Sequence, residues 1–284
     1  MINVHIGGVP EHFNLAWYLS LKDKLYQDKG INLRWHDYHG GTGQMNKALR
    51  EGDIDLAVIL TEGIIKDITE GNPSKIVQTF VASPLIWGIH VAANSNYNNV
   101  NQLRGKKAAI SRWGSGSHLM TYINAKQHSW DLENDLNFEI IGDLKGAIKG
   151  LSHGDADYFM WEKFTTKPLV DNGVFRHVAD CPTPWPCFVI AARDTFINQH
   201  KLELKIILDI INDTTKTFKN IPAIDEMIAE RYQQNIKDVR LWLSLTKWSQ
   251  DQISKSVVER IQQQLLDLNI ISFKIDYKKL VVTL

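Results

Sequence analysis

Short apolar segments alternate with helical segments through the first two thirds of this chain, and this alternation limits the fold more than any other feature. Most of the apolar segments are followed by a glycine or by polar residues. The segments predicted as strands are residues 2–7, 31–38, 55–60, 75–82, 88–93, 107–110, 137–141, 157–160, 175–179 and 188–192. Repeated strand–helix units of this kind predict an open α/β sheet with right-handed crossovers.

The segments between the strands have helical spacing of their apolar residues. They predict helices at residues 11–27, 44–50, 119–127, 144–151 and 164–170, and one that starts at residue 61. Thr42 is expected to cap the second of these helices. Ligands of open α/β sheets bind beyond the carboxyl ends of the strands. In the first part of the chain these ends carry Gly8, Glu11, Thr42, Thr61 and Glu62.

The pattern of apolar residues changes from residue 194 onward, where it has helical spacing and predicts no further strands. Helices are predicted at 202–218, 221–232, 239–245 and 253–268. Their apolar faces need a partner, and the first sheet is the natural one. The sequence thus predicts two lobes, one formed by residues 1–86 with 188–284 and the other by 87–187. The chain would cross between them twice, which predicts a hinge and a ligand cleft between the lobes.

The segment 111–118 joins a predicted strand to a predicted helix with the sequence Ser-Arg-Trp-Gly-Ser-Gly-Ser-His. Ser115 or Ser117 can cap the helix, whose first N–H groups have no partner within it. Such a helix end attracts an anion or a polar oxygen. Arg112 adds a fixed positive charge, and Trp113 adds an aromatic face. The alternative is a tight turn that binds nothing, since glycine and serine are common in turns.

Two acidic residues occupy matching places where a strand meets a helix. Glu62 and Glu162 would attract a cationic or amino-bearing ligand if both faced the cleft, but an acid in the first turn of a helix also stabilises the helix dipole without any ligand. Four tryptophans are predicted at cleft or hinge positions. Their rings could line the binding site and stack on a planar ligand, or they could pack in the lobe cores. They are Trp87, Trp113, Trp161 and Trp185.

Composition excludes several classes of function. Lys and Arg number 32, as do Asp and Glu, so a net charge of zero argues against nucleic acid or an anionic membrane as the main partner. No apolar run approaches the ~20 residues of a membrane span, so membrane insertion is not expected. The sequence opens on a predicted strand rather than on a secretory leader, which predicts a cytoplasmic location. If a leader has been removed, the location would be periplasmic or membrane-anchored.

Catalytic and metal signatures are not apparent. The chain has two cysteines, Cys181 and Cys187, which are expected to be reduced core thiols, although a disulfide between them stays open. No Ser/His/Asp order and no ligand spacing for a metal stands out. We therefore expect no metal and no cofactor.

Several motifs together resemble one known group of proteins. These are the loop 7–13, the glycine turn 40–44, the segments 53–57 and 111–118, and a Gly-Asp-x-Asp pattern that occurs at 52–55 and again at 154–157. In this order they resemble the type II periplasmic-binding-protein fold, in the branch of nitrate-, alkanesulfonate- and thiamine-pyrimidine-related binding proteins. The resemblance covers nearly the whole chain. Residues 161–168 are similar to a sub-branch that includes intracellular members.

The resemblance implies a solute-binding protein that closes on a small heterocyclic or zwitterionic organic ligand, with an ABC-type transporter permease as its partner. An enzyme of thiamine-pyrimidine metabolism on the same scaffold is the first alternative, although the cysteine-rich iron cluster of one such enzyme is missing here. A regulatory sensor is the second. The candidate ligand contacts are Gly8, Glu11, Phe13, Thr42, Gly43, Thr61, Glu62, Trp87, Arg112, Trp113, Ser115, Gly116, Ser117, Trp161, Glu162 and Trp185.

Overall fold

The computed structural model describes residues 1–284 and separates into two compact units. Unit 1 comprises Met1–Ser83, Trp185–Tyr232 and Val239–Leu284, and unit 2 comprises Pro84–Pro184 and Gln233–Asp238. The sequence-based division after residues 86 and 187 lies three residues from two of these crossings, and it has no counterpart for Gln233–Asp238.

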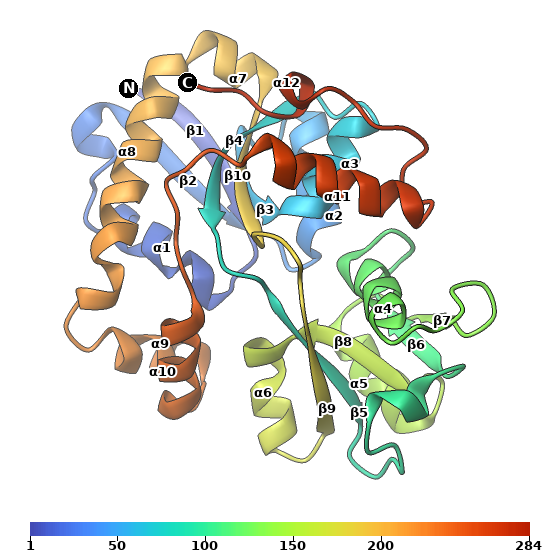
Figure 1. Cartoon of the computed structure of the whole chain (residues 1–284). Coiled ribbons are helices and arrows are strands. Elements are labelled where there is room, and N and C mark those ends of the chain that lie inside the picture. The colour runs from blue at the N-terminus through green and yellow to red at the C-terminus, as the bar shows by residue number, and fades with distance from the viewer. The chain divides into compact units, whose positions relative to one another are not determined.

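Unit 1 is built on a mixed five-stranded sheet (Figure 1). Its strands are β1 (Ile2–Gly8), β2 (Ile31–Asp37), β3 (Leu56–Leu60), β4 (Ser74–Val81) and β10 (Phe188–Arg193). They lie in the order β2-β1-β3-β10-β4. β1 is parallel to β2 and β3, whereas β10 is antiparallel to β3 and β4. β3 therefore has a parallel neighbour on one side and an antiparallel neighbour on the other.

Helices surround the unit 1 sheet, and their apolar faces are buried. They are α1 (Leu15–Lys22), α2 (Gly41–Glu51), α3 (Thr61–Thr69), α7 (Asp194–Gln199), α8 (Lys201–Thr217), α9 (Ile224–Tyr232), α11 (Lys255–Asp267) and α12 (Tyr277–Leu280). A further helix, α10 (Ile236–Leu245), begins in the segment that belongs to unit 2. α8 packs against α1 and α11 packs against α3, so the C-terminal helices cover the first sheet, as the sequence predicts.

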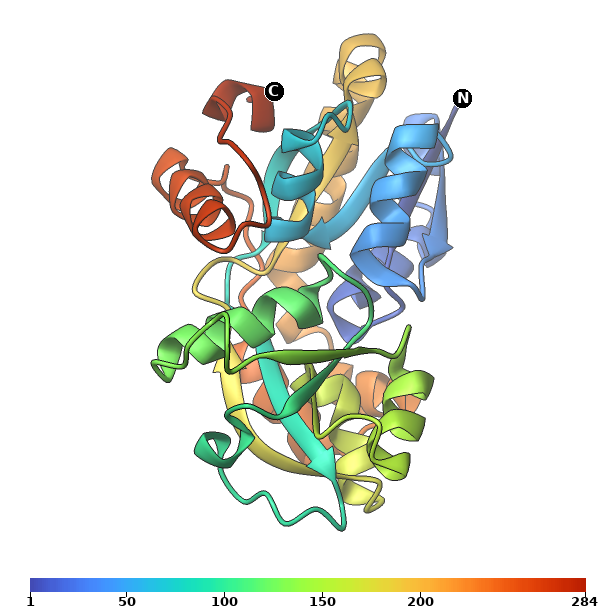
Figure 2. The same ribbon diagram turned by 90° about the vertical axis from the view of Figure 1, so that its right-hand side faces the viewer.

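Unit 2 repeats the same sheet topology with its own strands. These are β5 (Ile86–Ala92), β6 (Lys107–Ile110), β7 (Asn137–Ile140), β8 (Tyr158–Glu162) and β9 (Phe175–Pro182), in the order β7-β6-β8-β5-β9. β6 is parallel to β7 and β8, and β5 is antiparallel to β8 and β9. The long pair β5 and β9 lies side by side in both ribbon views (Figures 1 and 2). Position by position, this is the arrangement of unit 1.

Three helices complete unit 2, which has a small apolar core. They are α4 (Gly116–Gln127), α5 (Leu144–His153) and α6 (Lys163–Asp171). α4 contacts β6 and β8, and α6 packs against β5 and β9. The core is formed by Ala109, Ala147, Leu151, Ala156, Phe159 and Phe175.

The repeated Gly-Asp-x-Asp pattern has the same structural role in both units. Gly52 and Gly154 have positive φ angles and end α2 and α5. The second aspartate then joins the sheet: the Asp55 carboxylate accepts a hydrogen bond from the backbone N–H of His5 at 2.8 Å. Asp157 accepts one from the N–H of Lys107, also at 2.8 Å. Each pattern therefore ends a helix and fixes the start of the next strand against its neighbour.

Two local predictions are wrong. The predicted helix 11–27 is only α1 after a 3₁₀ turn, and Lys24 adopts a left-handed backbone. The chain turns there because Tyr26 is buried, with its hydroxyl 3.1 Å from the Ser20 hydroxyl. Thr42 does not cap α2, whose N-cap is Gly40; instead the Gln44 side chain accepts the Gly40 N–H at 3.0 Å.

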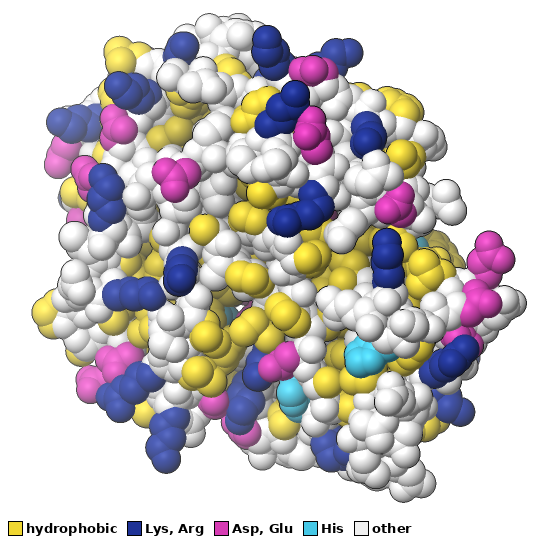
Figure 3. Space-filling model, viewed as in Figure 1, with side chains coloured by type: hydrophobic (Ala, Val, Ile, Leu, Met, Phe, Trp, Pro, Cys, Tyr) yellow, Lys and Arg dark blue, Asp and Glu magenta, His cyan; other side chains and the backbone are white.

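The surface charges, the helix lengths and the cysteines bear on the expectations drawn from composition. On the face drawn in Figure 3, basic and acidic side chains are interspersed. None of the helices combines the length and the apolar character needed to cross a membrane. Cys181 and Cys187 are both buried. No three His, Cys, Asp or Glu side chains are grouped as metal ligands.

Candidate functional site

Three serines meet where β6 passes into α4 in unit 2. Ser115, one of the two caps that the sequence allows, is the N-cap of α4, and its hydroxyl accepts the His118 N–H at 3.3 Å. The Ser117 hydroxyl lies 3.0 Å from that of Ser115 and 3.1 Å from that of Ser111, and it also accepts the Ser111 N–H. The serine hydroxyls therefore form a fixed polar cluster at the positive end of a twelve-residue helix.

Arg112 and Trp113 lie in the loop beside this cluster and are exposed. Arg112 has no ion-pair partner, and partial desolvation lowers the pKa of its guanidinium. Trp113 is 60% exposed and contacts the rings of His118 and Phe138. The loop thus presents an unpaired positive charge and an aromatic ring next to a helix N-terminus.

His118 has a structural role at the same turn. Its Nδ1 atom accepts the Gly114 N–H at 3.1 Å, and its ring packs edge-on against Trp113, Tyr122 and Phe138. Burial lowers the pKa of this imidazole to about 4, so the ring is neutral at pH 7. It holds the loop rather than supplying charge.

Glu62 is the best-defined polar group of unit 1. It lies in the first turn of α3, is 2% exposed, and accepts the indole N–H of Trp185 at 2.8 Å. Its second carboxylate oxygen is buried without a hydrogen-bond partner. Burial raises the pKa of the Glu62 carboxyl to about 7, against the weaker opposing effect of hydrogen bonds from its own backbone N–H and from Trp185.

The residues around Glu62 fix the start of α3. The Thr61 hydroxyl donates to the Pro186 carbonyl at 2.6 Å, and the Thr61 N–H donates to the Cys187 carbonyl. Thr42 and Gly43 lie in α2, and a Cβ atom at Gly63 would be 2.3 Å from the Thr42 methyl group. The structure therefore brings together four predicted residues of unit 1: Thr42, Thr61, Glu62 and Trp185.

The remaining predicted residues of unit 1 follow β1. Gly8 ends this strand, and a Cβ atom there would be 2.4 Å from Cη2 of Trp35, so only glycine fits. Glu11 precedes the 3₁₀ turn that contains Phe13. Phe13 is buried and packs against Phe188 and Trp242, which makes it a core residue of this unit.

In unit 2, three predicted residues are neighbours on β5 and β8. Trp87 is opposite Glu162 in the strand pairing, and its ring contacts Trp161 edge-on. Glu162 caps α6 by accepting the Thr165 N–H at 2.6 Å and the Thr165 hydroxyl at 2.8 Å. Burial raises the pKa of Glu162 to about 7, although these bonds oppose the shift. Glu162 thus stabilises the start of a helix, the ligand-free role that the sequence allows for it, whereas Glu62 keeps an oxygen without a partner.

Sequence reasoning missed a polar group that follows β1 in unit 1. His12 is 1% exposed, and its Nε2 atom has no partner. Its ring stacks on Phe13 and meets Trp242 edge-on at 4.3 Å between centroids. Burial lowers the pKa of His12 to about 3. No local sequence signal indicates this contact, because Trp242 is 230 positions away in the sequence.

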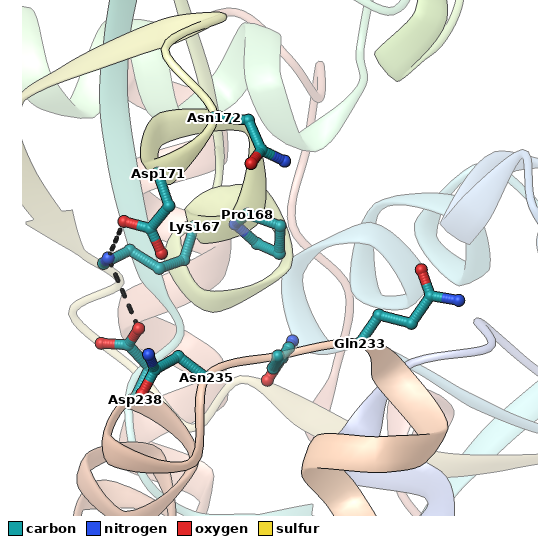
Figure 4. A pocket seen from close by; sticks show the side chains of 8 residues that line it. Lys167, Pro168, Asp171, Asn172, Gln233, Asn235 and Asp238 are labelled. Carbon is teal, nitrogen blue, oxygen red and sulfur yellow. Dashed lines mark hydrogen bonds and ion pairs between the residues drawn. The ribbon is translucent and has the colours of Figure 1, made fainter.

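A small polar cavity of about 170 Å³ lies in unit 2 at the end of α6 (Figure 4). Its walls come from the last residues of α6 and from the segment Gln233–Asp238, and four side-chain amides and two carboxylates line it together with a lysine and a proline. None of the predicted site residues contributes to it.

Comparison with solved structures decides the fold. The Candida albicans CA3427 gene product, described as exhibiting the generic periplasmic binding protein structural fold, matches with a TM-score of 0.89 and 22% identity, over 97% of this chain and 93% of that one. The chain has the type II periplasmic-binding-protein fold. A family model described as "Ca3427-like PBP" matches residues 87–181, which lie within unit 2.

Two bacterial binding proteins share the fold at lower identity. The alkanesulfonate-binding protein SsuA of Xanthomonas axonopodis pv. citri, bound to MOPS, matches with a TM-score of 0.80 and 16% identity, over 94% of this chain and 93% of that one. The periplasmic nitrate-binding protein NrtA of Synechocystis PCC 6803 matches with a TM-score of 0.65 and 14% identity, over 83% and 68%. No curated protein sequence matches the chain.

These relatives give no support to the cytoplasmic location expected from the sequence, since NrtA is named as periplasmic. The ABC-type permease expected from the resemblance stays a prediction.

Proposed function

We propose that this chain is a solute-binding protein for a small organic ligand that carries an anionic group. The observation that carries the proposal is the turn before α4, where Arg112 lacks an ion-pair partner beside the serine cluster of the helix N-terminus. Backbone N–H groups and the helix dipole favour a sulfonate, carboxylate or phosphonate there, and a guanidinium binds such groups with two parallel hydrogen bonds.

Glu62 supports a second feature of the ligand. A buried carboxyl with one oxygen lacking a partner favours a ligand group that donates an N–H to it. An anionic group and an amino or ring N–H in one molecule describe a zwitterion. MOPS, which is bound in the SsuA structure, combines a sulfonate with a ring amine. We propose the same combination of charges for the ligand of this chain.

The proposal predicts that thermal stability rises with such ligands. A ligand present at 100 times its dissociation constant adds roughly 2.7 kcal/mol to the free energy of unfolding, which corresponds to a Tm increase of about 5 °C or more. Differential scanning fluorimetry and tryptophan fluorescence would compare MOPS, methanesulfonate, nitrate and methylphosphonate with morpholine and pyrimidines. A response to morpholine and pyrimidines with none to any anion would contradict the anionic assignment.

The Arg112→Gln variant tests the anion contact directly. Loss of a charge-assisted hydrogen bond costs about 1.5–3 kcal/mol, so affinity for the responding anion should fall by roughly 10- to 100-fold. Arg104→Gln is the matched control, because Arg104 is also an exposed arginine of unit 2 but pairs with Asp135 at 2.7 Å. Equal losses in both variants would show a general charge effect and would leave the α4 turn without a binding role.

A further inference from the structure

The segment Gln233–Asp238 is attached to unit 2 although the residues on either side of it belong to unit 1. Two contacts hold it against α6. The Gln234 amide nitrogen donates to the Phe164 carbonyl at 3.2 Å, and the Asp238 carboxylate lies 3.4 Å from the Lys167 ammonium group. Figure 4 shows Lys167 reaching across from α6 to Asp238 in the first turn of α10.

Lys167 has a second partner on its own helix. Its ammonium group also pairs with Asp171, four residues further along α6 (Figure 4). If Asp238 moves away, Lys167 keeps this ion pair and is not left as an unpaired charge. All three side chains are also partly exposed, at 32% for Lys167, 46% for Asp171 and 22% for Asp238. Breaking the pair with Asp238 therefore costs little free energy, and salt screens it.

The backbone and the packing of the segment also favour release. Gln233, its first residue, has a φ angle of +51°, a left-handed conformation that a residue with a side chain keeps only while its surroundings enforce it. The cavity of about 170 Å³ lies along the segment, and the buried Gln234 side-chain oxygen has no partner. A polar cavity of this size admits water, so the contact is neither apolar nor fully packed.

We propose that Gln233–Asp238 is a releasable strap, and that Lys167 acts as its switch by pairing either with Asp238 and Asp171 together or with Asp171 alone. In the released state α6 stays folded, and the segment Gln233–Asp238 no longer contacts it. Ionic strength, or any group that competes for the Lys167 ammonium, sets the balance between the two states.

Hydrogen–deuterium exchange of the full chain tests this proposal. Asp238→Asn should speed exchange of the strap amides roughly two- to fivefold, the range expected for loss of one partly exposed ion pair, and leave exchange in α6 unchanged. Asp171→Asn is the matched control: it removes the other partner of the same lysine, so strap exchange should stay equal or become slower. In wild-type protein 0.5 M salt, a concentration that shortens the screening length to about 4 Å, should speed strap exchange, and in Asp238→Asn it should not.

A second pair of variants approaches the strap from α6. Lys167→Gln should speed strap exchange as Asp238→Asn does. Lys163→Gln should not, because Lys163 pairs with Asp180 on β9. Unchanged strap exchange in both Asp238→Asn and Lys167→Gln would overturn the proposal. So would faster exchange in α6 together with the strap, because the change would then be local unfolding of the helix.

Discussion

Replacing Gly146 by alanine should destabilise unit 2 by about 3 kcal/mol or more, the upper range for forcing an atom into a packed site. A Cβ atom at this position would lie 1.7 Å from the carbonyl oxygen of Ile141 and 2.8 Å from its carbonyl carbon. Because these are backbone atoms, no side-chain rotation relieves the clash. The Gly146 N–H also donates to the capping carboxylate of Asp143, so any shift of the first turn of α5 loses that hydrogen bond as well.

Gly150→Ala is the matched control in the same helix. The nearest atom to a Cβ there is a methyl group of Ile141 at 3.2 Å, which can move slightly. Alanine favours a helix interior by up to about 1 kcal/mol over glycine, so this variant should be neutral or slightly stabilised. Urea unfolding followed by circular dichroism, with exchange of the α5 amides to locate the effect, separates the two variants. Similar stability of both would show that α5 adjusts freely and that the clash at Gly146 carries no cost.

The elements could be predicted from the sequence where their signal is local. Strands such as β3 and β10 are short apolar runs bounded by polar residues, and all ten predicted strands begin within two residues of the observed ones. The first helix was predicted too long because its apolar spacing continues past Lys22. What ends it is tertiary: Tyr26 is needed in the core, and the backbone turns at Lys24 to bring it there.

The antiparallel strands could not be predicted in the same way. β10 reads as an ordinary buried strand, but its partners are β3 and β4, which precede it by more than 100 residues. Whether β10 pairs in a parallel or an antiparallel direction depends on the path by which the chain comes back to the first sheet. The residues of the strand itself do not indicate this path. The same limit hides Gln233–Asp238, where five of the six residues are polar and the contacts with α6 are made by two side chains.

In the candidate site, too, local features could be predicted from the sequence, whereas contacts between distant residues could not. A cap at Ser115 could be predicted, with Ser117 as the alternative, because capping at a strand-to-helix turn is a local property. The bond between Trp185 and Glu62 joins residues 123 positions apart, so the sequence identified both residues without indicating that they meet. Their contact changes the interpretation of Glu62, because it places the carboxyl in a buried environment with a single side-chain donor.

That environment makes Glu62 a source of pH-dependent stability. The pKa of its carboxyl is raised from 4.5 to about 7 in the folded protein, chiefly by burial. Below pH 4.5 both folded and unfolded chains hold the proton, and the group contributes nothing to the pH dependence. Between pH 4.5 and about pH 7 the unfolded chain releases the proton while the folded chain keeps it, so the free energy of unfolding falls as the pH rises. Above pH 7 the loss is complete, at ~3 kcal/mol for a shift of this size.

Glu62→Gln should remove this slope. Glutamine keeps an oxygen that accepts the Trp185 indole N–H but does not titrate, so the variant should gain about 3 kcal/mol on wild type between pH 4.5 and pH 8. Because Glu162 has a raised pKa as well, Glu162→Gln is the matched control: its capping bonds with Thr165 lie in unit 2, and its effect should add to that of Glu62→Gln. Denaturant unfolding at half-unit pH intervals measures both. If the free energy of unfolding of wild type and of Glu62→Gln depended on pH in the same way, water or a neighbouring charge would have to stabilise the Glu62 carboxylate. Glu62 would then not be a buried carboxyl with an oxygen that lacks a partner, and the proposed ligand N–H would lose its support.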